Sequence, residues 1–383
     1  MSEFEPARRL RGIEKSVIRQ VFDRARPGSI NLGLGEPDLP TPDVIRREAA
    51  RVVVEEQNGY TTHAGLSALR ERVAADYPQM NLTPEQVVIT AGSQEALYLA
   101  LLTLVDEGDE VLIPDPGFVA YPTIVRMAGG TPRFYTMPAA RDFAFDAEEF
   151  RRGLTPRTKA VVCISPSNPT GRVLSRAELN EMARALEGSG AYLVSDEIYR
   201  DIYYTAERPA SVSEFRRERT LVISGLSKSM CMTGWRLGWL CGDADVLRSA
   251  LVLHGYTTTC ASTVSQKAAL AAWTEEAASA RASMRETFHA RRDHLLGLLS
   301  RELGLRAVAP EGAFYTMVDV SAHGDSMSVA ERLLEHRVIT VPGSAFGAQG
   351  EGFLRVSFCA DTQVLEEGVR RMSEALRELP RRG

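Results

Sequence analysis

Short apolar segments alternate with longer helical patterns through the middle of the chain. We expect strands over residues 87–90, 110–113, 159–165, 192–195, 220–224 and 237–241. These segments are almost continuously apolar, which is typical of a parallel sheet that helices cover on both faces. The pattern therefore predicts an α/β fold, with a mostly parallel open sheet covered by helices, over residues 36–280.

Capping residues mark where helices of this domain begin. Thr83 with Gln86, and Ser175 with Glu178, have the spacing of a capping box, and Thr41 precedes a proline. After residue 280 the pattern changes to a long charged helix over 286–303, short strands over 314–318 and 352–357, and a terminal helix. We expect a smaller α+β domain over 281–383, and residues 1–35 to form an arm that joins this small domain or a partner subunit.

Composition and charge narrow the classes of function. Apolar residues make up 44% and charged residues 25% of the 383 positions, as in an average globular protein. The net charge of -5 provides no general attraction for nucleic acid or for an anionic membrane. The five cysteines are widely spaced, and the six histidines lack the spacing of metal ligands, so we expect neither disulfides nor a metal site. The absence of a signal-peptide pattern and of a long apolar stretch predicts a cytoplasmic protein.

Polar and small residues follow several of the predicted strands, where open α/β sheets bind their ligands. Residues 91–94, Ala-Gly-Ser-Gln, lead from one strand into a helix. Backbone N–H groups at such a helix start suit a phosphate, although a plain turn explains the segment equally well. Phe118 follows the next strand and could present a ring to a ligand or pack in the core.

Three further strand ends carry more specific chemistry. Asn168 lies in a turn that two prolines and a glycine make rigid. Asp196 ends a buried strand, where a carboxylate is costly unless it meets a cation or good hydrogen-bond donors. Lys228 lies among Gly, Ser and Met residues, eight positions before Arg236. Desolvation and this second cation would favour a neutral, nucleophilic amine.

Together these motifs resemble the class I aminotransferases related to aspartate aminotransferase, which are fold-type I pyridoxal 5′-phosphate (PLP) enzymes. The resemblance extends from residues 31–38 to residues 353–358. Its most specific string is Ser-Lys-x-x-x-x-Thr-Gly-x-Arg-x-Gly over 227–238, and Asn-Pro-Thr-Gly and Asp-Glu-Ile-Tyr precede it in the same order as in the family.

The resemblance implies roles for the residues at matching positions. Lys228 corresponds to the lysine that holds PLP as an internal aldimine and moves the proton between substrate and cofactor. Asp196 corresponds to the carboxylate that pairs with the ring nitrogen and keeps the ring an electron sink. Tyr199 and Asn168 correspond to the groups that hydrogen-bond the phenolic oxygen of the cofactor, and Phe118 to the aromatic side chain that stacks on its ring.

The other matches concern the phosphate, the substrate and the partner. Positions that correspond to the phosphate site are Gly92, Ser93, Gln94, Ser227 and Arg236. Arg355 corresponds to the arginine that binds the substrate α-carboxylate, assisted by Asn168 and the backbone near Gly35. Tyr60 corresponds to a tyrosine that reaches the phosphate of the neighbouring subunit, which implies a homodimer with shared active sites.

Departures from the family pattern bear on the substrate. Gly225 stands where many relatives carry a hydroxyl, so Ser227 or Ser224 would have to replace that contact. Gln94 stands where some aspartate-specific relatives have a lysine, and the mouth segment 13–18 is partly apolar. We therefore expect ping-pong transfer of an amino group to a 2-oxo acid from a neutral or aromatic L-amino acid, with aspartate still open.

Two alternatives use the same fold. A PLP-dependent carbon-sulfur β-lyase would need the same lysine and the same electron sink. A PLP-binding transcription regulator would need a DNA-binding domain first, and fewer than 40 residues precede Gly35. The sequence therefore favours the aminotransferase over both.

Overall fold

The computed structural model describes residues 4–379 of the chain. Within them, seven strands form a central sheet in the order β2-β8-β7-β6-β5-β3-β4. Their bounds are β2 (Val87–Thr90), β3 (Glu110–Asp115), β4 (Thr131–Thr136), β5 (Thr158–Ile164), β6 (Tyr192–Asp196), β7 (Thr220–Gly225) and β8 (Gly238–Gly242). Strand β8 is antiparallel to β2 and β7, and the other pairs are parallel. The predicted α/β fold with a mostly parallel open sheet is confirmed.

Helices cover both faces of this sheet because its strands are apolar on both sides. One cluster of buried side chains packs the sheet against α4 (Ser93–Leu104), α5 (Ala120–Met127) and α8 (Ala244–Thr257). Another packs it against α6 (Ala147–Gly153) and α7 (Arg176–Ala185), and a third packs β2 and β8 against α3 (Ser67–Ala75) and α9 (Thr263–Ala269). The edge strand β4 has one buried residue among six, so it lacks the apolar run from which the other strands were predicted.

Of the three predicted helix starts, one is confirmed together with its capping residue, and two differ. Helix α7 begins after Ser175 with the capping box in place. Helix α2 (Asp43–Glu55) forms where a helix was expected, but its N-cap is Pro42 and no side chain caps it, because the hydroxyl of Thr41 donates to the carbonyl of Cys231 instead. The capping box of Thr83 and Gln86 also forms, but it closes only a single 3-10 turn. Since β2 begins at residue 87, no room is left there for the expected α-helix.

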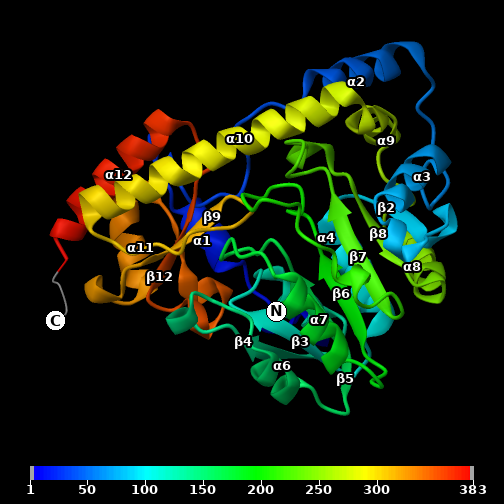
Figure 1. Cartoon of the computed structure of the whole chain (residues 1–383), viewed down its shortest axis with the longest axis horizontal. Coiled ribbons are helices and arrows are strands. Elements are labelled where there is room, and N and C mark those ends of the chain that lie inside the picture. Colours follow the sequence, from blue (N-terminus) through cyan, green and yellow to red (C-terminus); the bar gives the residue numbers. More distant parts are fainter. Residues whose placement is uncertain (1–3, 380–383) are drawn as a thin grey trace.

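The C-terminal part has the expected mixture of helices and strands. Helix α10 (Glu275–Leu298) starts earlier than predicted, because Thr274 caps it, and it continues into a π-helical turn over Leu299–Leu303. Strands β9 (Tyr315–Asp319), β11 (Val341–Pro342) and β12 (Phe353–Ser357) form an antiparallel sheet beside α11 (Ser326–Glu335) and α12 (Thr362–Arg377). Figure 1 shows α10 extending from beside α2 to α12, so it crosses the predicted boundary at residue 280. That division of the chain stays a prediction.

The N-terminal segment lies against this C-terminal part. It contains α1 (Val17–Asp23), followed by β1 (Ile30–Asn31), which pairs in parallel with β10 (Val338–Ile339). Val21 packs in a small cluster with Leu334 and Ile339. Residues 17–31 therefore contact the elements that follow α10.

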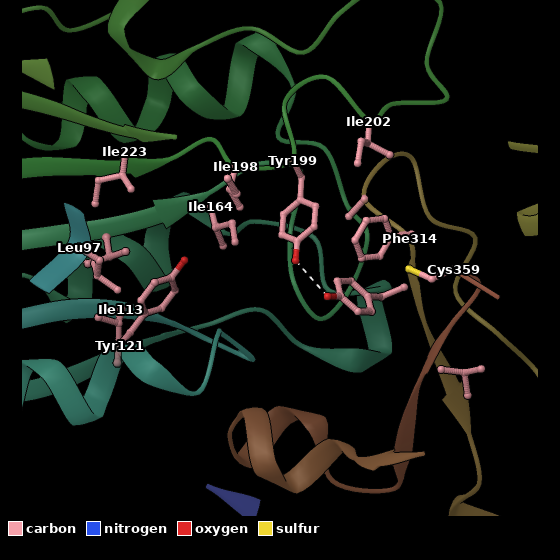
Figure 2. Close-up of a cluster of buried hydrophobic side chains, with 14 of the residues drawn as sticks. Leu97, Ile113, Tyr121, Ile164, Ile198, Tyr199, Ile202, Ile223, Phe314 and Cys359 are labelled. Atoms are coloured by element: carbon pink, nitrogen blue, oxygen red, sulfur yellow. Dashed lines mark hydrogen bonds between the residues drawn. The ribbon is translucent and has the colours of Figure 1, made fainter. Parts of the chain in front are cut away.

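One cluster of buried side chains joins both parts of the molecule. It extends from Leu97 and Ile113 beside the large sheet to Phe314 and Cys359 (Figure 2). Shared packing of this kind holds the ends of the large sheet in a fixed place relative to β9 and β12. Within residues 4–379, no helix has the length and apolar character that spanning a membrane requires.

Candidate active site

A cavity of about 270 Å³ lies at the carboxyl ends of the parallel strands. Most of the residues predicted from the sequence line it: Gly35, Ser93, Gln94, Phe118, Asn168, Asp196, Tyr199, Ser227, Lys228, Arg236 and Arg355. Ile18, from the predicted mouth segment 13–18, also lines it. The lining is completed by residues without a role predicted from the sequence, namely Leu34, Leu97, Ile164, Ile198, Thr233 and Tyr315. Because parallel strands end at one edge, residues from distant segments of the chain meet there.

Lys228 follows β7 and places its amine in the cavity. The amine donates a hydrogen bond to the carbonyl oxygen of Gly35, at 2.8 Å. Burial lowers the pKa of this lysine, and the nearby cations Arg355 and Arg236 act in the same direction. The predicted depression of the lysine pKa therefore has the predicted causes, and a neutral amine is favoured more than in an exposed lysine.

Asp196 ends β6 and is only 6% exposed. The hydroxyl of Tyr121, on α5, donates a hydrogen bond to this carboxylate at 2.9 Å, and the backbone N–H of Ile198 donates another at 3.2 Å. Burial nevertheless raises the pKa of Asp196 to about 6. The two hydrogen bonds hold the carboxylate in place, but they offset only part of the cost of burying its charge. A cationic ligand group would stabilise its ionised form.

Arg236 and the first residues of α4 form a cationic cradle at another side of the cavity. The guanidinium of Arg236 donates to the carbonyl oxygens of Ala91, at 3.2 Å, and Thr233, at 3.0 Å. Gly92 has a φ of +92°, a conformation that strains other residues, and a Cβ there would lie 2.6 Å from Nη2 of Arg236 and displace the guanidinium. Gly92 itself does not line the cavity but allows Arg236 to approach the start of α4, at Ser93.

Arg355, on β12, is 3% exposed and lies between two aromatic rings. Its guanidinium carbon is 4.2 Å from the ring centre of Tyr315 and 4.7 Å from that of Phe346. The nitrogens Nη1 and Nη2 donate to Oδ1 of Asn168, at 2.8 Å, and to the carbonyl oxygen of Gly33, at 2.6 Å. Its Nε is buried without a hydrogen-bond partner among the described residues, so one donor is free for an anion.

Aromatic side chains complete the walls. The ring of Phe118 packs edge-on against Tyr121, with centroids 5.6 Å apart. The hydroxyls of Tyr199 and Tyr315 lie 3.0 Å apart in a buried hydrogen bond (Figure 2). A Cβ on Gly35 would lie 1.5 Å from the hydroxyl of Tyr315, so this glycine is required for the close approach.

Two further expectations concern Tyr60, whose contact with a partner subunit stays a prediction, and the replacement of the hydroxyl that is missing at Gly225. The side chain of Tyr60 is 88% exposed and does not line the cavity of this chain. A Cβ on Gly225 would lie 2.8 Å from the carbonyl oxygen of Leu237, so the close approach of β7 and β8 excludes a hydroxyl side chain there. Of the two possible replacements, Ser227 lines the cavity, whereas Ser224 donates its hydroxyl to the carbonyl of Glu197 at 3.1 Å.

Sequence reasoning missed Tyr121 and Tyr315. Each makes its polar contact with a residue far away in the chain, and locally each looks like an ordinary aromatic core residue. The one available signal for Tyr121 is its position three residues after Phe118, on the same face of a helix start.

Comparisons with known proteins agree with this geometry. The model of the family described as aminotransferase class I and II matches residues 27–372. The aspartate/prephenate aminotransferase of Thermus thermophilus is 39% identical over 354 residues, which cover 91% of each chain. The aromatic-amino-acid aminotransferase 2 of Thermococcus litoralis is 35% identical over 97% of this chain and 98% of its own.

The solved structures agree as well. The structure of aspartate aminotransferase from Thermus thermophilus with maleate superposes with a TM-score of 0.93, at 35% identity, over 97% of this chain and all of that chain. The chain belongs to the class I and II aminotransferases. It is an aminotransferase, and the similar proteins favour neither the β-lyase nor the transcription regulator.

Proposed function

We propose that this aminotransferase binds pyridoxal 5′-phosphate in the cavity and transfers an amino group from an L-amino acid to a 2-oxo acid by a ping-pong mechanism. The observation that carries the proposal is that Lys228, with its lowered pKa, and the buried carboxylate of Asp196 line one cavity. The guanidinium groups of Arg236 and Arg355 line the same cavity. This arrangement has a complementary group for each polar part of the cofactor.

The chemistry of the donor set fits PLP. Its phosphate suits Ser227, Arg236 and the backbone N–H groups at the start of α4. Its protonated ring nitrogen suits Asp196, and its aldehyde suits the amine of Lys228. The phenolic oxygen suits the hydroxyl of Tyr199 and the amide of Asn168, with Phe118 against the ring; these matched positions are all in the lining or beside it.

When bound, PLP supplies an electron sink for the negative charge that develops at the substrate Cα. The amine of Lys228 can take the proton from Cα, because burial and nearby cations favour its neutral form. Asp196 must be ionised to pair with a cation, and the hydrogen bond from Tyr121 favours that form. The guanidinium of Arg355 binds the substrate carboxylate and so orients Cα toward the amine of Lys228.

We propose neutral or aromatic amino acids as the favoured donors. Near the mouth, the lining contains Ile18 and Leu34, with Gln94 and Thr233 as uncharged polar groups. The two arginines of the lining are assigned to the phosphate and the α-carboxylate, which leaves none in the described lining for a distal carboxylate. Relatives are named for aspartate and prephenate and for aromatic amino acids, so both classes need testing.

A half-reaction assay distinguishes these donors. The PLP-loaded enzyme is mixed with single amino acids, and bleaching of its cofactor absorbance is followed. We expect faster bleaching with phenylalanine, tyrosine or leucine than with aspartate. Rapid bleaching with aspartate alone would refute the preference while leaving the aminotransferase activity intact.

We also propose a cytoplasmic homodimer with shared active sites. Tyr60 and Tyr256, 88% and 90% exposed, are large apolar side chains on the surface of this chain, as are Val53, Val54 and Val252. Burial of such side chains favours association, and it would bring Tyr60 to the phosphate of a partner's cofactor. Sedimentation of wild type and of Tyr256→Asp tests the dimer: wild type should sediment as a dimer and the variant should dissociate at lower concentration.

Chemical trapping tests the assignment of Lys228. Borohydride added to the PLP-loaded protein should fix the cofactor on residue 228. In Lys228→Ala the transamination should be lost while PLP still binds reversibly, through Arg236 and Asp196. Lys159→Ala is the matched control, because Lys159 lies near the amino end of β5, and it should behave as wild type. Labelling at another lysine, or unchanged turnover in Lys228→Ala, would refute the proposal.

A further inference from the structure

A mostly buried carboxylate lies behind the cradle formed by Arg236 and the start of α4. Glu95, in the first turn of α4, does not line the cavity. Its Oε2 accepts a hydrogen bond from the backbone N–H of Ala91 at 2.5 Å. Its Oε1 accepts the hydroxyl hydrogen bond of Thr258 and lies 3.1 Å from Nδ1 of His254. One side chain therefore connects the start of α4 to the end of α8.

His254 and Thr258 fix the position of Glu95. His254 is completely buried in the last turn of α8, and its Nε2 has no hydrogen-bond partner within the described chain, so its contact with Glu95 is its only side-chain hydrogen bond there. Burial opposes the ionisation of Glu95, but the bonds from His254, Thr258 and Ala91 outweigh it and lower the pKa of Glu95. Glu95 is therefore an ionised acceptor at neutral pH.

The bond to Ala91 determines how the backbone enters the cradle. With its N–H bound by Glu95, Ala91 offers its carbonyl oxygen to Nη2 of Arg236 at 3.2 Å. The next residue, Gly92, donates its N–H to the carbonyl of Thr90 at 2.8 Å, and its carbonyl accepts the hydroxyl of Thr90 at 3.0 Å. The peptide groups before the helix are thus fixed, and the N–H groups at the helix start remain for an anion.

We propose that Glu95, held by His254 and Thr258, is a positioning residue for the phosphate of the cofactor. It does not touch the phosphate. It fixes the Ala91 peptide, and through it the guanidinium of Arg236 and the first N–H groups of α4. This inference rests on the proposed function, and it adds a residue that the resemblance did not assign.

The negative charge of Glu95 makes it possible to test whether the residue acts by positioning the Ala91 peptide or by its charge. A carboxylate near a phosphate repels it, so the charge alone would weaken binding. If the hydrogen bonds are what matters, an amide should preserve the cradle, because its oxygen can accept from the N–H of Ala91 while its NH2 group donates to Oγ1 of Thr258 and to Nδ1 of His254 in the tautomer that accepts there. Glu95→Gln should therefore retain binding, whereas Glu95→Ala should not.

A comparison of PLP with pyridoxal isolates the contribution of the phosphate to binding. Pyridoxal has the same ring and aldehyde as PLP but no phosphate, so it depends on Lys228 and Asp196 and not on the cradle. Equilibrium dialysis of the apoprotein with each compound gives two dissociation constants for every variant. In Glu95→Ala we expect about tenfold weaker binding of PLP and unchanged binding of pyridoxal, since a lost supporting hydrogen bond of this kind has effects of that order. In Glu95→Gln both constants should stay within about threefold of wild type.

Glu366→Ala is the matched control. Glu366, on α12, also contacts a histidine, with its Oε1 3.0 Å from Nε2 of His294, and it does not line the cavity. Neither dissociation constant should change in this variant. Equal losses for PLP and pyridoxal in Glu95→Ala, unchanged PLP binding in Glu95→Ala, or a Gln variant as weak as the Ala variant would each overturn the inference. Failure of wild type to bind PLP would overturn the proposed function itself, and this inference with it.

Discussion

The inner wall and the mouth of the cavity are built in different ways. At the inner wall, Asp196 and Arg355 are buried charges whose positions are fixed by hydrogen bonds from Tyr121 and to Asn168. At the mouth, Ile18 lies on α1, where most side chains are at least partly exposed.

This difference corresponds to what each region would recognise. Under the proposed function, the inner wall would face the cofactor and the α-carboxylate, which is common to all amino acid substrates. The mouth would face the substrate side chain, which varies. Substitutions at the inner wall should therefore affect all donors equally, whereas substitutions at the mouth should change the preference among them.

Asp196→Asn should have the largest effect and should act in opposite directions on activity and stability. Under the proposed function Asp196 pairs with the ring nitrogen of PLP, so its replacement should lower kcat/KM on the order of a thousandfold for every donor. The apoprotein should become more stable, because burial raises the pKa of Asp196 from 3.8 to about 6. At pH 7 the free energy of unfolding should rise by about 3 kcal/mol.

The pH dependence of that stability follows from the direction of the shift. Folded protein binds the Asp196 proton more tightly than unfolded protein, so the contribution of this group is present below pH 3.8 and is lost as the pH rises to about 6. Urea unfolding of the apoproteins should therefore give matching stabilities near pH 3.8 and a growing advantage of Asp196→Asn up to about pH 6. A variant that is less stable than wild type at pH 7 would contradict this account.

Arg355→Lys should lower kcat/KM by about a hundredfold for all donors, because lysine keeps the charge but loses the fork that reaches both Asn168 and Gly33. Steady-state kinetics with three unrelated amino acids would measure this. Arg200→Lys is a matched control, since Arg200 is also buried and pairs with Glu197 outside the cavity. A loss confined to one donor would show that Arg355 binds a side chain instead.

Tyr121→Phe should lower kcat/KM by about tenfold, as expected for a hydrogen bond to a charged group. The bond from Tyr121 lowers the pKa of Asp196, so its loss should move the acidic limb of the pH-rate profile to higher pH. Tyr135→Phe is the control, because Tyr135 is buried and its hydroxyl donates to the carbonyl of Val162, at 3.2 Å, away from Asp196. If the two variants had the same pH profile, Tyr121 would have no special role.

Ile18→Ala should have the smallest effect and the most selective one. Removing part of an apolar contact should raise KM about threefold for aromatic donors and leave small donors unchanged. Comparing phenylalanine with alanine as donors measures this ratio. An equal change for both would mean that α1 supports the inner wall and not the substrate side chain.

The sequence revealed most of the sheet and most of the cavity lining because both follow local patterns. Strands with continuous apolar runs were found to within two residues, and Lys228, Asp196 and Asn168 lie in specific motifs or at strand ends. The structure brings these residues together, and their roles remain predictions. Strand β4 was missed because an exposed edge strand has no such run.

Contacts between distant residues could not be found in this way. The bond from Tyr121 to Asp196 joins residues 75 positions apart, and the bond from Thr258 to Glu95 joins residues 163 positions apart. Nothing in the local sequence distinguishes a tyrosine that fills the core from one that also binds a carboxylate. The start of α10, in contrast, could have been found from Thr274 and the two glutamates that follow it.

The short segment from Asn31 to Gly35 contacts two side chains of the candidate active site at once. The side chain of Asn31 accepts the N–H groups of Gly33 and Leu34 and stiffens the segment, while the carbonyls of Gly33 and Gly35 receive Arg355 and Lys228. A change that displaces this segment would therefore disturb the amine of Lys228 and the guanidinium of Arg355 together. Protein engineering that alters the backbone of residues 31–35 should therefore be expected to change the environment of both side chains, even where neither of them is substituted.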